Sequence, residues 1–230
     1  MPTQAELALT AEHRQSFDTL IELLLADLDP IWRTLDPSDA RGVQDALYPT
    51  LDDLVALYGP AAAELGAGWY EDMREAAGAP GAFRALPGAA PDAEATRVLT
   101  RWGTGPLFSA QPDIAATQSL IEGALQKLVA DQDRASVFRS INADSTARGW
   151  SRQTTGKSCP FCIFIAARGT VYSAETARFS SHNSCDCIAV PAFGDGPVVA
   201  ALPYTPSSKF RTQAARDANN ARLRAALAAT

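Results

Sequence analysis

The cysteines of this 230-residue chain all lie between positions 159 and 187, together with one of its two histidines. Cys159 and Cys162 form a C-x2-C pair, and His182, Cys185 and Cys187 follow as H-x2-C-x-C. Four cysteines scattered over the whole chain would not fall so close together. The segment therefore has a shared role, and the candidates are metal binding, disulfide bonding and thiol redox chemistry.

Zinc binding is the role that this spacing favours. A C-x2-C turn directs two thiolates to one point, and a second ligand pair across a short loop completes a tetrahedron. Thiolate and imidazole ligands suit zinc better than magnesium or calcium. We expect Cys159, Cys162 and His182 to bind a structural Zn²⁺. The fourth ligand is Cys185 or Cys187, or both bind the ion if His182 only hydrogen-bonds to a ligand.

Disulfide and redox roles are less consistent with the rest of the chain. The first residues, Met-Pro-Thr-Gln-Ala-Glu, have neither the basic nor the apolar region of a secretory signal peptide. A thioredoxin-like C-x2-C motif lies beside a βαβ pattern, and no such pattern surrounds this pair. We therefore expect the cysteines to bind a metal that holds a loop-rich segment together.

The net charge differs between the two parts of the chain, since the N-terminal part is acidic and the C-terminal part is basic. Residues 1–145 carry 10 Lys and Arg against 22 Asp and Glu, a net charge of −12. Residues 146–230 carry 10 against 4, a net charge of +6. A basic C-terminal tail of this kind binds nucleic acid or an acidic protein surface. Its candidate binding residues are Lys209, Arg211, Arg216, Arg222 and Arg224.

Residues 1–145 are predicted to be entirely helical, because their apolar residues recur at steps of three and four. Asp29-Pro30 is expected to kink the first helix, and Gly59-Pro60 to end the second. Residues 78–91, rich in Gly, Ala and Pro, are predicted to form a loop. No apolar run approaches the roughly 18 residues of a membrane span. The expected helices cover residues 17–35, 43–58, 61–77, 92–102 and a long stretch from Pro112.

These patterns predict a mainly α protein in three parts. Residues 1–145 form an acidic helical domain, 146–200 a small zinc-stapled, loop-rich module with a few short strands, and 201–230 a basic tail. Within the module, a short helix is expected at 163–167. Short strands are expected at 170–172 and 188–193.

Two types of residue in the helical part could suggest a functional site. His13 is interpreted as a solvated helix residue. Trp69 and Tyr70, at helical spacing, are interpreted as ordinary core.

No motif in the chain predicts catalysis. Gly156-Lys157-Ser158 resembles the end of a P-loop, but the glycine required at position 151 is a serine. A cytidine deaminase has its H-x-E before P-C-x-x-C, whereas here the order is reversed and Ser184 replaces the glutamate. An H-E-x-x-H motif is absent. We expect no enzyme and name no catalytic residue.

Several runs in order carry a resemblance to a known family: R-G-W-S-R, C-P-F-C, A-A-R-G-T-V-Y, F-S-S-H-N-S-C-D-C and P-A-F. Together they resemble the C-terminal motif region of MuF-like minor capsid proteins, which are head-morphogenesis proteins of tailed bacteriophages, here of the actinobacterial-phage type. The resemblance covers residues 148–193. It implies a virion protein of the phage head, made in the host cytoplasm and incorporated near the portal during procapsid assembly. It also implies contacts with the portal or major capsid protein, a metal role for the five Cys and His residues, and no catalytic role.

Two functions remain open from the sequence. The first is a structural assembly protein with a zinc-stapled C-terminal region. The second is a zinc-containing DNA-binding module that acts on packaged or ejected DNA, which would show steep salt dependence. The tail beyond Phe210 has no aromatic residue to stack on bases. The structural function is therefore favoured.

Overall fold

The computed structural model describes residues 2–154, 160–167, 171–173, 179, 181–195 and 197–198, with 212–214, 217–218, 221 and 225 near the C-terminus. The chain divides into two compact units. The first comprises residues 1–140 and 180–185, and the second comprises residues 141–179 and 186–230. The described part is mainly helical with two short strands, in agreement with the predicted fold class.

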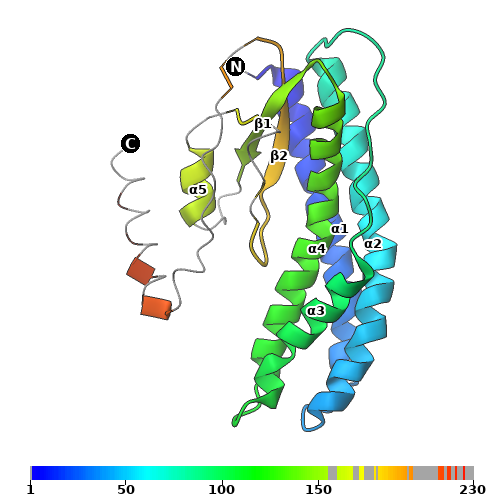
Figure 1. Cartoon of the computed structure of the whole chain (residues 1–230), viewed down its shortest axis with the longest axis vertical. Helices are drawn as coiled ribbons and strands as arrows, with labels where there is room; N and C mark the ends of the chain where they lie inside the picture. The colour runs from blue at the N-terminus through cyan, green and yellow to red at the C-terminus, as the bar shows by residue number, and fades with distance from the viewer. Residues whose placement is uncertain are drawn as a thin grey trace. The chain divides into compact units, whose positions relative to one another are not determined.

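Three long helices run alongside one another in the first unit (Figure 1). These are α1 (Gln4–Trp32), α2 (Ala40–Ala76) and α4 (Ile114–Ala143). The shorter α3 (Ala93–Gly103) and the 3₁₀ helix η1 (Gly105–Phe108) connect α2 to α4. Helix α1 begins with a capping box in which Thr3 and Glu6 satisfy each other's backbone N–H groups.

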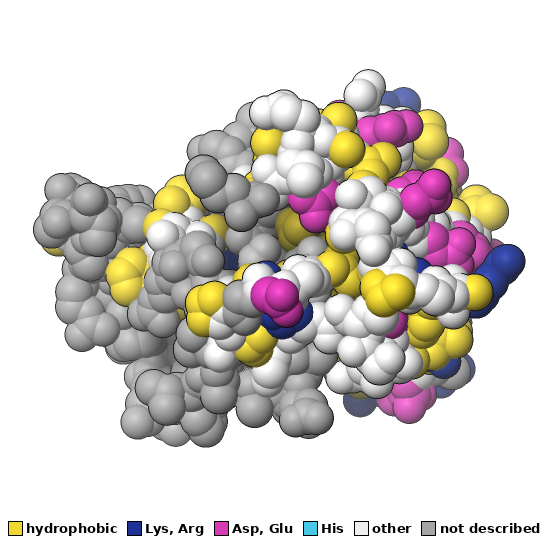
Figure 2. Space-filling view, turned by 90° about the horizontal axis from the view of Figure 1, so that it is seen from above, with side chains coloured by type: hydrophobic (Ala, Val, Ile, Leu, Met, Phe, Trp, Pro, Cys, Tyr) yellow, Lys and Arg dark blue, Asp and Glu magenta, His cyan; other side chains and the backbone are white. Residues whose placement is uncertain are grey.

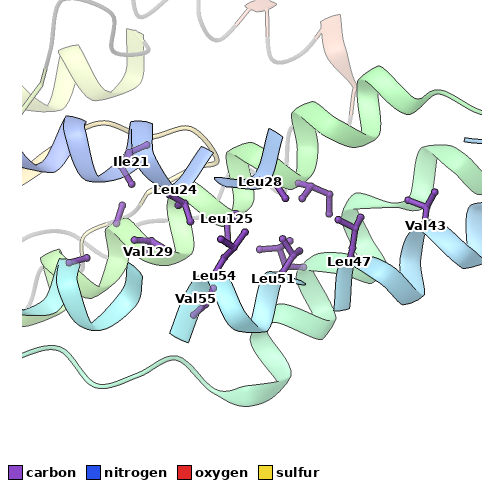
Figure 3. Close-up of a cluster of buried hydrophobic side chains, with 14 of the residues drawn as sticks. Ile21, Leu24, Leu28, Val43, Leu47, Leu51, Leu54, Val55, Leu125 and Val129 are labelled. Atoms are coloured by element: carbon purple, nitrogen blue, oxygen red, sulfur yellow. The ribbon is translucent and has the colours of Figure 1, made fainter. Parts of the chain in front are cut away.

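The core of this unit is formed by the apolar stripes that the sequence predicts. Figure 3 shows leucine, isoleucine and valine side chains of α1, α2 and α4 pointing toward one another. Their burial removes apolar surface from water, which is the main favourable term in folding. The labelled members of this cluster are Ile21, Leu24, Leu28, Val43, Leu47, Leu51, Leu54, Val55, Leu125 and Val129.

Helix α2 differs from the prediction because it does not end at Gly59-Pro60. It continues from Ala40 to Ala76 with Pro49 and Pro60 inside it. A proline removes one helical hydrogen bond and clashes with the Cβ of the preceding residue, but Gly59 has no Cβ. Buried residues on both sides of the proline then favour one continuous helix. In α1, Pro30 lies in the last turn, and the helix ends at Trp32.

The second unit contains an antiparallel pair of strands, β1 (Ala147–Gln153) and β2 (Ile188–Phe193). The sequence predicts β2 but not β1, because the R-G-W-S-R run has no apolar alternation. Trp150 also forms an isolated bridge with Tyr172, whose backbone exchanges hydrogen bonds of 2.9 and 2.7 Å with it. Helix α5 (Pro160–Ala166) begins earlier than the helix expected at 163–167.

Gly149 is the residue that permits this strand arrangement. Its φ of +153° is disfavoured for residues with a side chain, and a Cβ there would lie 2.1 Å from the Tyr172 carbonyl oxygen. The next residue, Trp150, is buried between aromatic rings. Its ring centroid lies 5.2 Å from that of Tyr172 and 5.3 Å from that of Phe179. Among the described residues of this unit, an aromatic cluster therefore forms part of the core.

In the view of Figure 2, acidic side chains are interspersed with apolar ones and with a few Lys and Arg. The Tyr58 hydroxyl of α2 donates a 2.5 Å hydrogen bond to Asp27 of α1, which raises the pKa of Tyr58 to about 12. None of the helices in the described ranges combines the length and the apolar character that a membrane crossing requires.

Candidate metal centre

Residues 181–185, which include His182 and Cys185, are held against helix α4 by hydrogen bonds from Ser181, from Ser184 and to Cys185. The Ser181 hydroxyl donates to Asp131 at 2.9 Å, and the Ser184 backbone N–H donates to the Gly123 carbonyl at 2.9 Å. Gly123 leaves the space for this contact, since a Cβ there would lie 2.6 Å from the Ser184 hydroxyl. The segment therefore belongs to the same compact unit as the helices.

Arg134 fixes the cysteine at the end of this segment. Its Nη2 donates to the Cys185 carbonyl at 2.8 Å, and its Nη1 donates to Asp131 at 2.7 Å. The side chain is only 3% exposed, so its charge requires the Asp131 carboxylate as a partner. Lys127 also pairs with Asp131. This network holds the Cys185 backbone without using the thiol.

A tight turn places His182 and Cys185 next to each other. The Cys185 N–H donates to the His182 carbonyl at 3.1 Å, and Ser184 adopts a φ of +57° within the turn. His182 Nδ1 lies 2.7 Å from the Asn183 carbonyl oxygen, which only accepts hydrogen bonds, so Nδ1 carries the proton. The lone pair of this imidazole is then on Nε2. Histidines that bind metals commonly donate their other nitrogen to a carbonyl in this way.

Cys162 lies on α5 with no exposed surface. Arg152 of β1 directs Nη1 at the Cys162 Sγ from 3.7 Å, and its guanidinium lies 3.7 Å from the centroid of the Phe179 ring. A guanidinium stacked on an aromatic face is held in place, and it complements the negative charge of a thiolate. The environment of Cys162 is thus suited to a metal-binding thiolate.

The structure brings together three of the five predicted ligands. One ligand atom each from Cys162, His182 and Cys185 lies within 4.8 Å of the other two. Two thiolates bound to one tetrahedral zinc ion at about 2.3 Å are about 3.8 Å apart, so small side-chain shifts suffice for binding. This group could hold a metal ion, and its sulfur and nitrogen donors suit zinc.

Cys187 is not part of this group. It is buried, and its Sγ lies 4.0 Å from Asp186 Oδ1. No disulfide joins Cys162, Cys185 and Cys187 to one another. Cys159 lies outside the described residues, and so do the tail residues Lys209, Arg211, Arg216, Arg222 and Arg224. Their predicted roles stay predictions.

His13 is not the solvated residue that the sequence analysis expects. It is only 3% exposed and stacks on Trp69, with ring centroids 4.0 Å apart and an angle of 6° between the planes. Its Nε2 lies 3.2 Å from the buried Asp133 Oδ1. The position of His13, four residues before the buried Phe17, places both on one helical face and could have revealed this burial. Trp69 and Tyr70 are core residues, as predicted.

The residues that orient the site had no signal in the sequence. Asp131 and Arg134 are separated from the cysteine segment by about 50 positions, and they look like ordinary charged residues of a helix surface. Only the packing of the segment on α4 shows their role.

Replacing Arg134 with methionine removes the donor to the Cys185 carbonyl and retains a long aliphatic side chain. We expect zinc affinity to fall by about ten- to a hundred-fold, the effect typical of losing a residue that orients a ligand. Competition with a chromophoric chelator measures the affinity, and circular dichroism checks that helix content is retained. Arg97→Met, at an exposed position on α3, is the matched control. Unchanged affinity in Arg134→Met would contradict the assigned role.

Comparison with known proteins gives one positive result. A family model described as VG15 protein matches residues 1–221, which include the first compact unit, most of the second and the cysteine segment. No curated protein and no solved structure matches the chain.

Proposed function

Because the chain belongs to the VG15 protein family, a family of viral proteins, we propose that it is a structural minor capsid protein of a tailed bacteriophage. It is incorporated into the head near the portal during procapsid assembly, and a structural zinc ion stabilises its C-terminal region. The observation that carries this proposal is the convergence of Cys162, His182 and Cys185 within the segment that resembles MuF-like proteins.

A structural role for the metal is supported by the residues around it. The group consists of two cysteines and one histidine, and Cys159 would supply a fourth ligand through the C-x2-C turn. Four protein ligands close the coordination sphere, whereas zinc catalysis keeps one position open for water or substrate. When bound, the ion supplies folding free energy to a segment that has little apolar core of its own.

The first unit offers a surface suited to a protein partner such as the portal or the major capsid protein. Trp102 and Val98 of α3 are about half exposed, and Phe108 of η1 is exposed to a similar degree. Exposed aromatic and aliphatic side chains that lie close together in the chain are typical of protein-binding surfaces. The net charge of −12 over residues 1–145 disfavours direct DNA binding by this unit.

The test is the protein composition of the particles. Quantitative mass spectrometry of gradient-purified heads and mature virions is expected to detect the chain at a few copies per particle. Particles assembled without the chain, and complemented with either the natural chain or a Cys162→Ser variant, show whether the metal group matters for incorporation. Absence of the natural chain from heads at every stage of assembly would refute the proposal.

A DNA-binding role is the second candidate, favoured by the net charge of +6 over residues 146–230. It predicts DNA affinity that falls steeply with salt, because each neutralised phosphate releases counterions. Fluorescence anisotropy with duplex DNA at several salt concentrations measures this slope. Truncation after residue 206 separates the tail from the metal group. Equal DNA affinity with and without the tail would assign the tail to a protein partner.

A further inference from the structure

A pocket with a volume of 460 Å³ lies in the first unit, away from the cysteine segment. It is lined by the middle of α2, by residues 87–92, by the first turn of α3 and by α4. Its volume is within the range of small-molecule sites in proteins, and most of its lining is apolar. Nothing in the proposed capsid function uses this pocket.

Gln132, a buried polar residue of the lining, has an unsatisfied acceptor. Its side chain is 6% exposed, and within the described part of the chain no group donates a hydrogen bond to its Oε1. Its Nε2 reaches the Leu128 carbonyl at 3.5 Å. A buried oxygen without a donor is destabilising, and such groups are rare in folded proteins. A ligand with an N–H group at this end of the pocket would satisfy it.

All charged residues of the lining are acidic. Asp52, Glu64 and Asp92 are exposed, and among the residues that the structure describes no Lys or Arg lines the pocket. Two of these carboxylates are fixed in position: Asp52 accepts a hydrogen bond from the Thr96 hydroxyl, and Asp92 caps α3 by accepting from the Glu94 N–H at 2.9 Å. The exposed part of the pocket therefore complements a cation.

The wall formed by residues 87–92 is held against α4 without a ligand. The Gly88 N–H donates to the Ser136 hydroxyl at 2.7 Å, and the preceding Leu86 N–H donates to the Ser140 hydroxyl at 2.9 Å. Arg139 also donates to the Pro87 carbonyl. A wall fixed in advance loses little conformational entropy on binding, which favours affinity for a small ligand.

We propose that this pocket binds a short aliphatic diamine, a small organic cation of the polyamine class. One ammonium group lies among the carboxylates of Asp52, Glu64 and Asp92. The methylene chain packs on the apolar lining formed by residues such as Val55 and Ala63. The second amine donates to Gln132 Oε1, the acceptor that otherwise has no donor.

The first experiment is an NMR titration of the ¹⁵N-labelled full chain with 1,4-diaminobutane. Saturable shifts are expected at backbone amides of the pocket lining. The neutral analogue 1,4-butanediol is expected to bind about two- to five-fold more weakly, because its hydroxyl lacks the charge that the carboxylates of Asp52, Glu64 and Asp92 attract. Equal binding of the diol, or no saturable shift with the diamine at millimolar concentration, would overturn the proposal.

Variants then test the two ends of the pocket. Gln132→Met removes the unsatisfied amide while keeping a similar shape, and we expect the diamine affinity to fall about ten-fold without loss of stability. Glu64→Gln is expected to weaken binding about two- to five-fold. Asp53→Asn changes an exposed carboxylate of the same helix outside the lining and should leave binding unchanged. Equal losses in Glu64→Gln and Asp53→Asn would show non-specific attraction and refute the site.

Discussion

Replacement of Cys162 with serine is expected to abolish stoichiometric zinc binding and to lower the thermal stability of the second unit. Cys162 is buried, and its sulfur belongs to the group formed with His182 and Cys185. Structural zinc contributes about 10–16 kcal/mol of apparent binding free energy in small zinc peptides, so loss of one thiolate removes a large stabilising term. Metal content by mass spectrometry and thermal unfolding followed by near-UV circular dichroism measure the two effects.

The far-UV helix signal of the same variant is expected to persist. The core formed by α1, α2 and α4 in the first unit has no contribution from Cys162. If the helix signal is lost together with the metal, the two units do not fold separately.

The cysteine variants also decide which thiols bind the ion. Cys187→Ser is the matched control, because Cys187 is equally buried but lies outside the ligand group. It should retain one zinc per chain, whereas Cys185→Ser should lose it. Cys159→Ser should lose it as well, since the C-x2-C spacing pairs this residue with Cys162. Loss of zinc in Cys187→Ser and retention in Cys185→Ser would reverse the assignment.

Replacement of His13 with alanine is expected to lower the free energy of unfolding by about 3 kcal/mol, the cost of removing a large buried ring or one partner of a buried polar pair. His13 belongs to α1, stacks on Trp69 of α2 and lies 3.2 Å from Asp133 of α4. The substitution leaves a cavity among three helices and a buried Asp133 carboxylate without the imidazole nitrogen that lies 3.2 Å from it. Urea unfolding followed by circular dichroism at 222 nm measures the change.

A double-mutant cycle separates the two contributions. Asp133→Asn removes the charge with little change in shape, and the combined variant should be less destabilised than the sum of the single changes. Glu12→Ala, at the exposed neighbouring position of α1, should change stability by less than about 0.5 kcal/mol. A loss of less than about 1 kcal/mol in His13→Ala would show that the stacked ring and its buried partner contribute little to the fold.

Much of the helical unit and part of the metal group follow from the sequence alone. Apolar residues at steps of three and four predict the buried faces of the long helices, because the period of the helix places these residues in one stripe. The spacing of Cys159 and Cys162, and of His182 and Cys185, predicts two ligand pairs, because residues three positions apart can direct their side chains to one point. These are local properties, determined by residues a few positions apart.

Contacts between distant residues required the tertiary structure. The continuity of α2 through Pro60 depends on the buried residues on both sides of the proline, which contribute more than the one hydrogen bond that it removes. Strand β1 exists because the β2 backbone pairs with it, and R-G-W-S-R has no strand pattern of its own.

The same distinction applies within the site. The sequence predicts five candidate ligands, and the fold brings Cys162, His182 and Cys185 together in a group that does not include Cys187. Arg134 reaches Cys185, 51 positions away, because the segment packs on α4. Local spacing determines which residues share a turn, whereas packing determines which turns meet, and only the tertiary structure contains that information.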